Sequence, residues 1–324
     1  MNLQLIDGAT IRDLVTPDVS RELMAAAMKM TSLREVELPL RRCLKLPDGL
    51  GMLSAMPGFV RPIAAAGLKL ISLVPPASRK GSSHLGLMIL YEAEGLTPRA
   101  ILCGATITAL RTAAVSALAT DRLARKDAKV LTILGSGEQA VAHIEALAPV
   151  RNWGECRVWT RNPMALDEIL ARHGDLLPIR ASDDPLEAVA GADVVCTVTA
   201  AREPLVCAEA IGPGTHLNLV GSSTSDSWEV EPELMRRASV FIDYWPSIMD
   251  QAGELLAAFR TGLVTPSHVQ AEIGEVLLGR HPGRSGSGEI TVFKSVGIAS
   301  QDIVMAAYVA EQAIACGRAR FASL

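Results

Sequence analysis

Three basic residues stand in stretches of sequence that are otherwise apolar. Arg41 lies in LPLRRCLKL, Lys69 in AAAGLKLISLV, and Arg111 between TAL and TAAVSALA. A buried charge is costly unless it is paired. One interpretation is therefore a pocket in which the guanidinium groups bind a carboxylate and the ammonium supplies a proton through a tunable pKa. The other is that each residue faces solvent, as most lysines and arginines do.

A glycine-rich turn joins an apolar run to a helix-like stretch in KVLTILGSGEQAVAHIEAL, residues 129–147. Its residues 135–140, GSGEQA, fit the pattern G-x-G-x-x-G/A. There the first glycine permits a tight turn, the second lets the backbone approach a pyrophosphate, and the small third residue lets the helix pack on the strand. The helix N-terminus also attracts phosphates. Because a predicted strand precedes the turn and a predicted helix follows it, we predict dinucleotide binding rather than a purely structural turn.

The end of the next predicted strand bears on the choice of dinucleotide. This strand, RVWT at 157–160, lacks the terminal acid that binds the ribose 2′-hydroxyl of NAD. It is followed by Arg161, which can stack on the adenine and pair with a 2′-phosphate. This arrangement favours NADP(H), with NAD(H) as the second possibility. The alternative for Arg161 is an ordinary exposed arginine.

The composition argues against several classes of protein. The chain has 324 residues, 49% of them hydrophobic, which is enough for two domains with their own cores. A net charge of −4 gives no sign of a nucleic-acid or membrane surface, and no apolar run reaches the ~20 residues of a membrane span. Six scattered cysteines without a C-x-x-C pair indicate reduced thiols in a cytoplasmic protein. No residues have metal-ligand spacing, so we expect no metal.

The rhythm of the sequence changes after about residue 120. Before it, short alternating runs separated by Gly and Pro predict a mixed or antiparallel sheet. From Lys129 onward, strands and helices alternate with short connections, which predicts an α/β fold with a Rossmann-type, doubly wound parallel sheet. The tail, 297–317, has a helical period and is expected to pack against the N-terminal part. We therefore predict an α+β domain of residues 1–120 plus 298–324 and a nucleotide-binding domain of residues 121–297.

The chain resembles the ornithine cyclodeaminase/mu-crystallin family of NAD(P)-dependent proteins. The matching stretches, in chain order, include PLR (39–41), GLKL (67–70), LRTAAVSALAT (110–120), LGSGEQA (134–140), LVGSSTSDSWEVEPEL (219–234) and TVFKSVGIASQD (291–302). The resemblance implies a homodimer in which the α+β domain binds substrate and dimerises. It also implies that Arg41, Lys69 and Arg111 line the active site, bind the carboxylate of an amino or imino acid, and in the case of Arg111 approach the cofactor diphosphate.

The family pattern extends the expected cofactor contacts beyond the glycine-rich turn. The stretch 294–297, KSVG, resembles the segment that closes over the nicotinamide. Together, the residues expected at the cofactor are Arg111, Thr112, Gly135, Ser136, Gly137, Glu138, Gln139, Arg161, Thr197, Val198, Thr199, Val220, Gly221 and Lys294.

One departure from the family pattern bears on the reaction. Cyclodeaminases carry an aspartate two residues after the glycine of the V-G motif, where this chain has Ser223. The local pattern GSSTSDSWEVE is more similar to ketimine reductases, in which a later aspartate corresponds to Asp226. Asp226 is a candidate catalytic residue, although a loop aspartate is often a turn residue. Glu229 is interpreted as a structural acid near the following helix.

The resemblance thus predicts NAD(P)H-dependent reduction of a carboxylate-bearing cyclic imine, such as pyrroline-2-carboxylate or piperideine-2-carboxylate, to an L-amino acid. Lys69 would supply the proton. The alternatives are an ornithine cyclodeaminase, an open-chain imino-acid or amino-acid dehydrogenase of the iminosuccinate or alanine type, and a mu-crystallin-like protein that binds NADPH and a ligand. The intact set of three cations argues against pure binding, because a binding protein needs no proton donor beside the carboxylate.

Overall fold

The structure is a computed structural model that describes residues 2–74 and 84–323. The chain divides into two compact units, residues 1–112 with 298–324 and residues 113–297. The sequence places the first division after residue 120, but the structure places it after Thr112. The reason is that α3 (Gly104–Leu123) is one continuous helix across this point, so the sequence pattern changes only where the helix ends.

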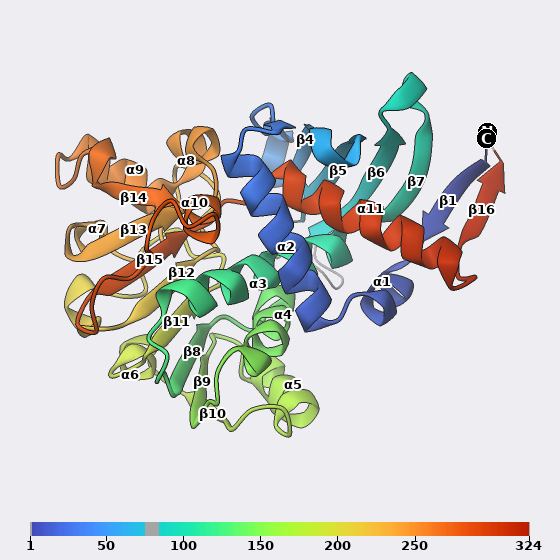
Figure 1. The fold of residues 1–324 in the computed structure, drawn as a ribbon. Coiled ribbons are helices and arrows are strands. Elements are labelled where there is room, and N and C mark those ends of the chain that lie inside the picture. Colours follow the sequence, from blue (N-terminus) through green and yellow to red (C-terminus); the bar gives the residue numbers. More distant parts are fainter. Residues whose placement is uncertain (1, 75–83, 324) are drawn as a thin grey trace. The chain divides into compact units, whose positions relative to one another are not determined.

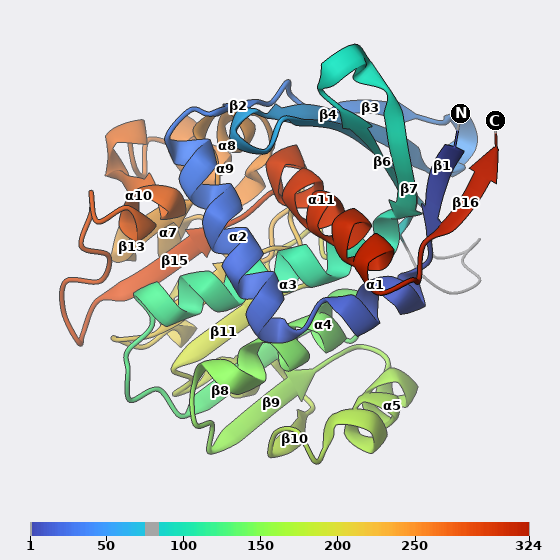
Figure 2. The ribbon, with the colours of Figure 1, turned by 45° about the vertical axis from the view of Figure 1, so that its right-hand side comes forward.

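The first unit is built on a mixed sheet (Figures 1 and 2). Its strand order is β16-β1-β7-β6-β5-β4-β2, with β3 paired to β4. Strands β4 to β7 form an antiparallel series, whereas β1 runs parallel to β7. The strands are β1 (Asn2–Ile6), β2 (Val36–Glu37), β3 (Arg42–Lys45), β4 (Met52–Val60), β5 (Ala65–Leu73), β6 (His84–Glu92), β7 (Pro98–Cys103) and β16 (Arg320–Ser323).

One face of this sheet is covered by helix α11 (Ala299–Ala315), which runs across the strands in Figures 1 and 2. Alternation along β5 buries Gly67 and Lys69 on this face, while their neighbours are partly exposed. A Cβ at Gly67 would lie 2.7 Å from Cγ1 of Ile303, so the helix can approach this closely only where the strand has glycine. The unit also contains α1 (Gly8–Leu14), α2 (Pro17–Ser32) and the first part of α3.

The second unit contains a doubly wound parallel sheet of order β10-β9-β8-β11-β12-β15-β13-β14. The order reverses between β8 and β11, and the predicted Rossmann-type fold class is confirmed. The strands are β8 (Val130–Leu134), β9 (Glu155–Trp159), β10 (Ile179–Ser182), β11 (Val194–Thr197), β12 (His216–Leu219), β13 (Ala238–Ile242), β14 (Val269–Glu272) and β15 (Ile290–Lys294). The helices are α4 (Glu138–Leu147), α5 (Pro163–His173), α6 (Pro185–Val189), α7 (Glu233–Arg237), α8 (Trp245–Gln251), α9 (Gly253–Arg260) and α10 (Ile273–Leu277).

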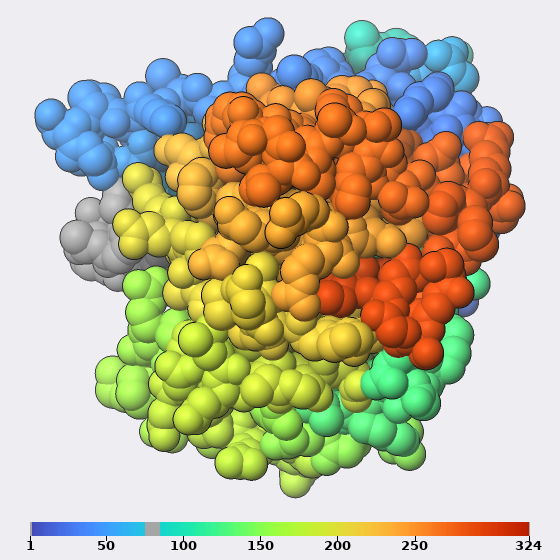
Figure 3. Space-filling model, turned by 90° about the vertical axis from the view of Figure 1, so that its left-hand side faces the viewer, coloured from blue at the N-terminus to red at the C-terminus, as the bar shows by residue number. Residues whose placement is uncertain are grey.

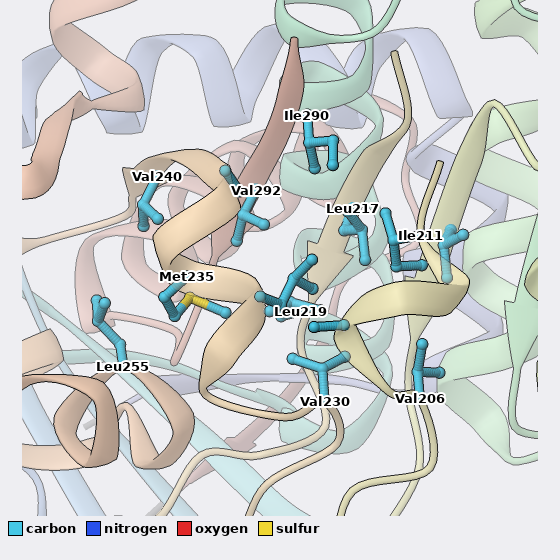
Figure 4. Close-up of a cluster of buried hydrophobic side chains, with 14 of the residues drawn as sticks. Val206, Ile211, Leu217, Leu219, Val230, Met235, Val240, Leu255, Ile290 and Val292 are labelled. Atoms are coloured by element: carbon cyan, nitrogen blue, oxygen red, sulfur yellow. The ribbon is translucent and has the colours of Figure 1, made fainter. Parts of the chain in front are cut away.

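Apolar side chains fill the core between this sheet and the segments that follow β12. Figure 4 shows Leu217 and Leu219 of β12 and Val292 of β15 beside Val230 and Met235, and all five are fully buried. Each such side chain contributes ~1.5–3 kcal/mol when it leaves water. On the face shown in Figure 3, the yellow and orange segments of this unit adjoin each other.

In the described part of the chain, no helix combines the length and the apolar character that a transmembrane segment requires.

Candidate functional site

A buried ion cluster occupies the first unit beneath α11. The Lys69 ammonium lies 2.8 Å from Oδ2 of Asp302, and Nε of Arg111 donates to Oδ1 of the same carboxylate at 3.0 Å. Nη1 of Arg111 also donates to Oε1 of Gln301 at 2.8 Å. Lys69 is 2% exposed, Arg111 4% and Asp302 0%. One carboxylate therefore holds two cations that the sequence predicted as site residues.

The secondary structure explains why these groups meet. Lys69 faces α11 because it shares the buried face of β5. Asp302 lies in the first turn of α11, where an acid is stabilised by the helix dipole. The hydroxyls of Thr31 in α2 and Ser300 lie 2.9 Å apart and link this first turn to the neighbouring helix. The first turn of α11 thus places the Asp302 carboxylate beside both cations.

The surroundings of Lys69 change its acidity. Burial lowers the pKa of Lys69 most strongly, and the positive charges of Arg111 and Arg41 lower it further. The charge and hydrogen bond of Asp302 oppose them, and the pKa falls from 10.5 to about 7. A lysine with this pKa can donate or accept a proton near neutral pH.

Arg41 completes the set of predicted cations. It precedes β3, is half-buried, and is close enough for its charge to act on Lys69. The group of Arg41, Lys69, Arg111 and Asp302 therefore carries net positive charge. Among the described residues, Nη2 of Arg111 forms no hydrogen bond, whereas Nε and Nη1 each form one. Such a group is suited to binding a carboxylate and exchanging one proton with another atom of the same ligand.

The glycine-rich turn lies in the second unit, between β8 and α4. Gly135 has φ +131°, and a Cβ there would lie 2.9 Å from the carbonyl oxygen of Val198 at the end of β11. A Cβ at Gly137 would meet nothing within 4 Å, which leaves room above the N-terminus of α4. Ala140 is fully buried against the strand. All three small residues thus fit the use that a dinucleotide makes of this motif.

The turn is connected to the end of β9. The hydroxyls of Ser136 and Thr160 lie 2.6 Å apart, and Thr160 Oγ1 also accepts a hydrogen bond from the amide of Asn162. Arg161 is exposed, and the first turn of α5 that follows contains no acid. The end of β9 is therefore compatible with the predicted binding of a 2′-phosphate.

The expected cofactor residues after β11 and β12 cluster around Glu229. Its buried carboxylate accepts hydrogen bonds from Thr197, Thr199, Gly221 and Ser222. Burial raises the pKa of Glu229, and the hydrogen bonds from Thr197 and Thr199 partly offset this. The sequence places Glu229 near the following helix, whereas the structure places it between two strand ends.

The side chain of Lys294, a residue expected at the cofactor, is engaged with other residues of the second unit. Its side chain is wholly buried, and Nζ donates to the carbonyl oxygen and to Oγ of Ser222, each at 2.6 Å. It also lies 3.2 Å from Oε1 of Glu254. The ammonium is therefore engaged inside the protein, and any cofactor contact at this position would use the main chain.

The remaining predicted site residues are divided between the two units. Thr112 is the last residue of its stretch in the first unit, next to Arg111. Asp226 is exposed on the loop between β12 and α7 of the second unit. Glu138 and Gln139 open α4, directly after the glycine-rich turn. Among the described residues, no group of His, Cys, Asp and Glu is arranged to hold a metal ion.

Asp302 is the site residue that the sequence analysis missed. In GIASQDIVMAAYVAEQAIACG it appears as an ordinary acid in the first turn of a helix. A usable signal was present, because three cations in apolar surroundings require an anion. Asp302 is an acid in a strongly apolar helix that the sequence already predicted to pack on the N-terminal part.

Comparison with known proteins decides the family. Residues 10–317 match the sequence profile of the ornithine cyclodeaminase/mu-crystallin family. The chain belongs to this family. The resemblance stated from the sequence is therefore confirmed.

Individual members of the family differ in the reaction they are named for. The chain is 32% identical over 312 residues to a Delta(1)-pyrroline-2-carboxylate reductase of Bacillus cereus, covering 94% of this chain and 95% of the relative. It is 34% identical over 270 residues to the ketimine reductase mu-crystallin of Mus musculus, covering 83% and 82%.

Solved structures of family members have the same fold. The Delta(1)-pyrroline-2-carboxylate reductase of Thermococcus litoralis, in complex with NADH and L-proline, superimposes with a TM-score of 0.94 at 30% identity, covering 98% of this chain and 99% of that one. An archaeal alanine dehydrogenase dimer with bound NAD gives 0.92 at 29% identity over all of both chains.

The ion cluster predicts a measurable titration of Lys69. In protein labelled with ¹³C at lysine Cε, we expect one NMR resonance to titrate near pH 7 and to disappear in Lys69→Met, whereas exposed lysines titrate at about 10.4. In Asp302→Asn this resonance should titrate at lower pH, because the carboxylate that favours the ammonium is gone. Asp13→Asn, which removes an exposed acid paired with Arg318, is the control and should leave it unchanged. Titration of Lys69 near pH 10, or a rise in Asp302→Asn, would contradict this account.

Proposed function

We propose that the protein reduces carboxylate-bearing imines with NAD(P)H. The substrates would be cyclic ketimines such as pyrroline-2-carboxylate and piperideine-2-carboxylate, and the products L-amino acids. The observation that carries this proposal is the buried cluster in which Asp302 holds Lys69 and Arg111. Its net positive charge suits the carboxylate, and its lysine suits the nitrogen that must gain a proton.

Each group of the cluster has a separate task. The glycine-rich turn and the ends of β11 and β12 would hold a reduced nicotinamide dinucleotide, which would supply the hydride for the imine carbon. Arg111, oriented by Asp302 and Gln301, presents its remaining donor Nη2 to the carboxylate, and Arg41 adds a second positive charge. Lys69 gives a proton from Nζ to the imine nitrogen and is left as a neutral amine, which a pKa of about 7 permits. Hydride and proton together convert C=N to CH–NH.

The position of Ser223 argues against a cyclodeaminase, which uses a carboxylate there to handle a second amine. A ligand-binding protein would not need a lysine with a lowered pKa beside its carboxylate site. The similarity to an alanine dehydrogenase keeps open-chain imino acids as the second candidate class of substrate. Asp226 remains a candidate for assisting proton transfer from its exposed loop.

We further propose that NADP(H) is preferred over NAD(H). The end of β9 offers Thr160, Arg161 and Asn162 where an NAD site would place an acid. The hydroxyl contact between Ser136 and Thr160 holds this strand end beside the glycine-rich turn. Arg161 thus follows a fixed residue and is exposed, as binding of a 2′-phosphate requires.

A homodimer is the assembly that we propose. The sheet of the first unit has a second face, opposite α11, on which leucines remain exposed: Leu44 (60%), Leu53 (42%), Leu85 (53%) and Leu87 (47%). Strand register places Leu44 opposite Leu53, and Leu53 and Leu85 both opposite Ser72, so leucines of β3, β4 and β6 lie in one row with Ser72 of β5. Apolar faces of this extent usually mark interfaces, and a second copy of the chain would bury the same leucines on both sides.

The proposed reaction is tested with purified protein and a substrate panel. Oxidation of NADPH and NADH should occur with pyrroline-2-carboxylate or piperideine-2-carboxylate, and proline or pipecolate should form. Lys69→Met replaces the lysine with an uncharged side chain that is also long and unbranched. It should lower kcat by about 10²–10⁴-fold, the usual contribution of an acid-base group. Turnover only with pyruvate and ammonia would assign an alanine dehydrogenase. Ammonia release from ornithine would assign a cyclodeaminase, and dinucleotide binding without turnover a ligand-binding protein.

Cofactor choice is tested at Arg161. Arg161→Ala should weaken NADPH binding roughly 10-fold or more, because a charge-assisted contact to phosphate is lost, and should leave NADH binding within about 2-fold. Arg172→Ala, an exposed arginine at the end of α5, is the matched control. Equal losses for both dinucleotides, or tighter binding of NADH by the unaltered protein, would refute the preference.

Assembly is tested by light scattering after size-exclusion chromatography. The unaltered protein should elute with twice its chain mass of 34.3 kDa. Leu53→Arg should shift it to the monomer, since a buried unpaired charge is unfavourable in an apolar interface. Leu186→Arg changes a leucine of the second unit with the same 42% exposure and should leave the dimer intact. A Leu53→Arg protein that still dimerises would exclude this face.

A further inference from the structure

We propose that Glu229 is a positioning residue for the nicotinamide half of the dinucleotide, an inference that rests on the proposed dinucleotide binding. Glu229 is fully buried and cannot touch a ligand itself. It would act through the main chain at the ends of β11 and β12, which it fixes relative to each other.

The carboxylate of Glu229 accepts hydrogen bonds from both strand ends. Oε2 accepts from Thr197 Oγ1 and the Gly221 amide, each at 2.7 Å, and from the Ser222 amide at 3.2 Å. Oε1 accepts from the amide of Thr199 at 2.7 Å and from its hydroxyl at 2.8 Å. Because β11 and β12 are parallel neighbours, one side chain joins their carboxyl ends.

The backbone is shaped to admit this carboxylate. A Cβ at Gly221 would lie 2.4 Å from Oε1 of Glu229 and 2.2 Å from the carbonyl oxygen of Thr199. Any side chain at Gly221 would therefore force the two strand ends apart. The glycine of the V-G motif is required by this contact, whatever binds above it.

A second buried group extends the connection to the next strand. Ser222 donates from Oγ to the Glu254 carboxylate, at 2.8 Å to Oε1 and 2.6 Å to Oε2. Lys294, at the end of β15 and opposite Leu219 of β12, binds both Ser222 and Glu254. The ends of β11, β12 and β15 are thus linked through buried charged groups.

The location of these strand ends gives the network its function. In doubly wound sheets a dinucleotide lies across the carboxyl ends of the strands, at the point where the strand order reverses. In this unit the order reverses between β8 and β11. The turn after β8 and the end of β9 serve the pyrophosphate and the adenosine, so the ends of β11 and β12 fall to the nicotinamide half.

The chain offers a matched control at the opposite end of the same strand. Asp193 directly precedes β11, and its Oδ2 accepts from the amides of Lys129 and Val130 at 2.7 and 2.9 Å. Arg125 donates to its other oxygen. Asp193 therefore ties β11 to β8 at the amino ends of the strands, as Glu229 ties β11 to β12 at the carboxyl ends.

The test compares two ligands in two variants. Glu229→Gln places an amide group against N–H donors, and we expect it to weaken NADPH binding, measured by fluorescence titration, about 10-fold or more. Binding of ADP-ribose 2′-phosphate, which lacks the nicotinamide, should change by less than about 2-fold. Asp193→Asn should lower the melting temperature yet leave both affinities within the same limit. Unchanged NADPH binding in Glu229→Gln, or equal loss of both ligands, would overturn the proposal.

A milder pair of variants covers the case in which Glu229→Gln does not fold. Thr197→Val removes one of the donors to Oε2 from a fully buried position and should weaken NADPH binding about 3-fold or more. Thr197→Ser retains the hydroxyl and should bind NADPH with the affinity of the unaltered protein. Equal NADPH affinity in both variants would also overturn the proposal. Because these measurements need no imine, they stand even if the proposed reaction fails, whereas a protein that binds no dinucleotide refutes the proposed function itself.

Discussion

The carboxylate of Asp302 is the contact on which the first unit depends. Two cations, Lys69 and Arg111, are buried beneath α11 and would be intolerable there without an anion. Removing one partner of a buried ion pair typically costs about 3–5 kcal/mol, because the other charge is left without compensation. Asp302 therefore stabilises the position of α11 and at the same time fixes the direction of both cations. The same carboxylate thus serves both the packing of α11 and the orientation of the two cations.

The same principle organises the second unit, with the signs reversed. There the buried anions Glu229 and Glu254 are compensated by backbone amides, hydroxyls and Lys294. The charged groups lie at the carboxyl ends of parallel strands, where the sheet hydrogen bonds end and the backbone needs other partners. A further acid, Asp243, accepts from the amides of Val296 and Gly297 after β15. Rigid strand ends are what a dinucleotide requires, because loosely held binding groups lose much of their effect.

The sequence predicted what is encoded locally. The run from Lys129 contains its own strand, turn and helix signals, so the Rossmann-type sheet and the tight turn at Gly135 could be inferred from neighbouring residues. Asp302 could not be inferred in this way, since it meets Arg111 across 191 positions. The side-chain partners of Lys294 could not be inferred either, for a related reason. Its neighbours in sequence indicate a strand end, but only the fold shows that Ser222 and Glu254 occupy the space in which its ammonium lies.

The chemistry of the cluster follows from the difference between its two kinds of cation. A guanidinium does not lose its proton in proteins, so Arg111 can hold a carboxylate through the whole reaction without changing charge. A lysine does release its proton when burial and nearby cations make the ammonium less stable, which is the condition of Lys69. Asp302 limits the fall in the pKa of Lys69, because its charge favours the protonated lysine. Without the acid, burial and the arginines would move Lys69 toward the neutral amine, and the proton would be absent when the imine nitrogen needs it. Without the arginines, the ammonium would be more stable and would release its proton less readily, although burial would still lower the pKa of Lys69. The combination of one shared carboxylate, a permanent cation and a titratable one therefore suits a site that must bind an acid and protonate a nitrogen in the same event.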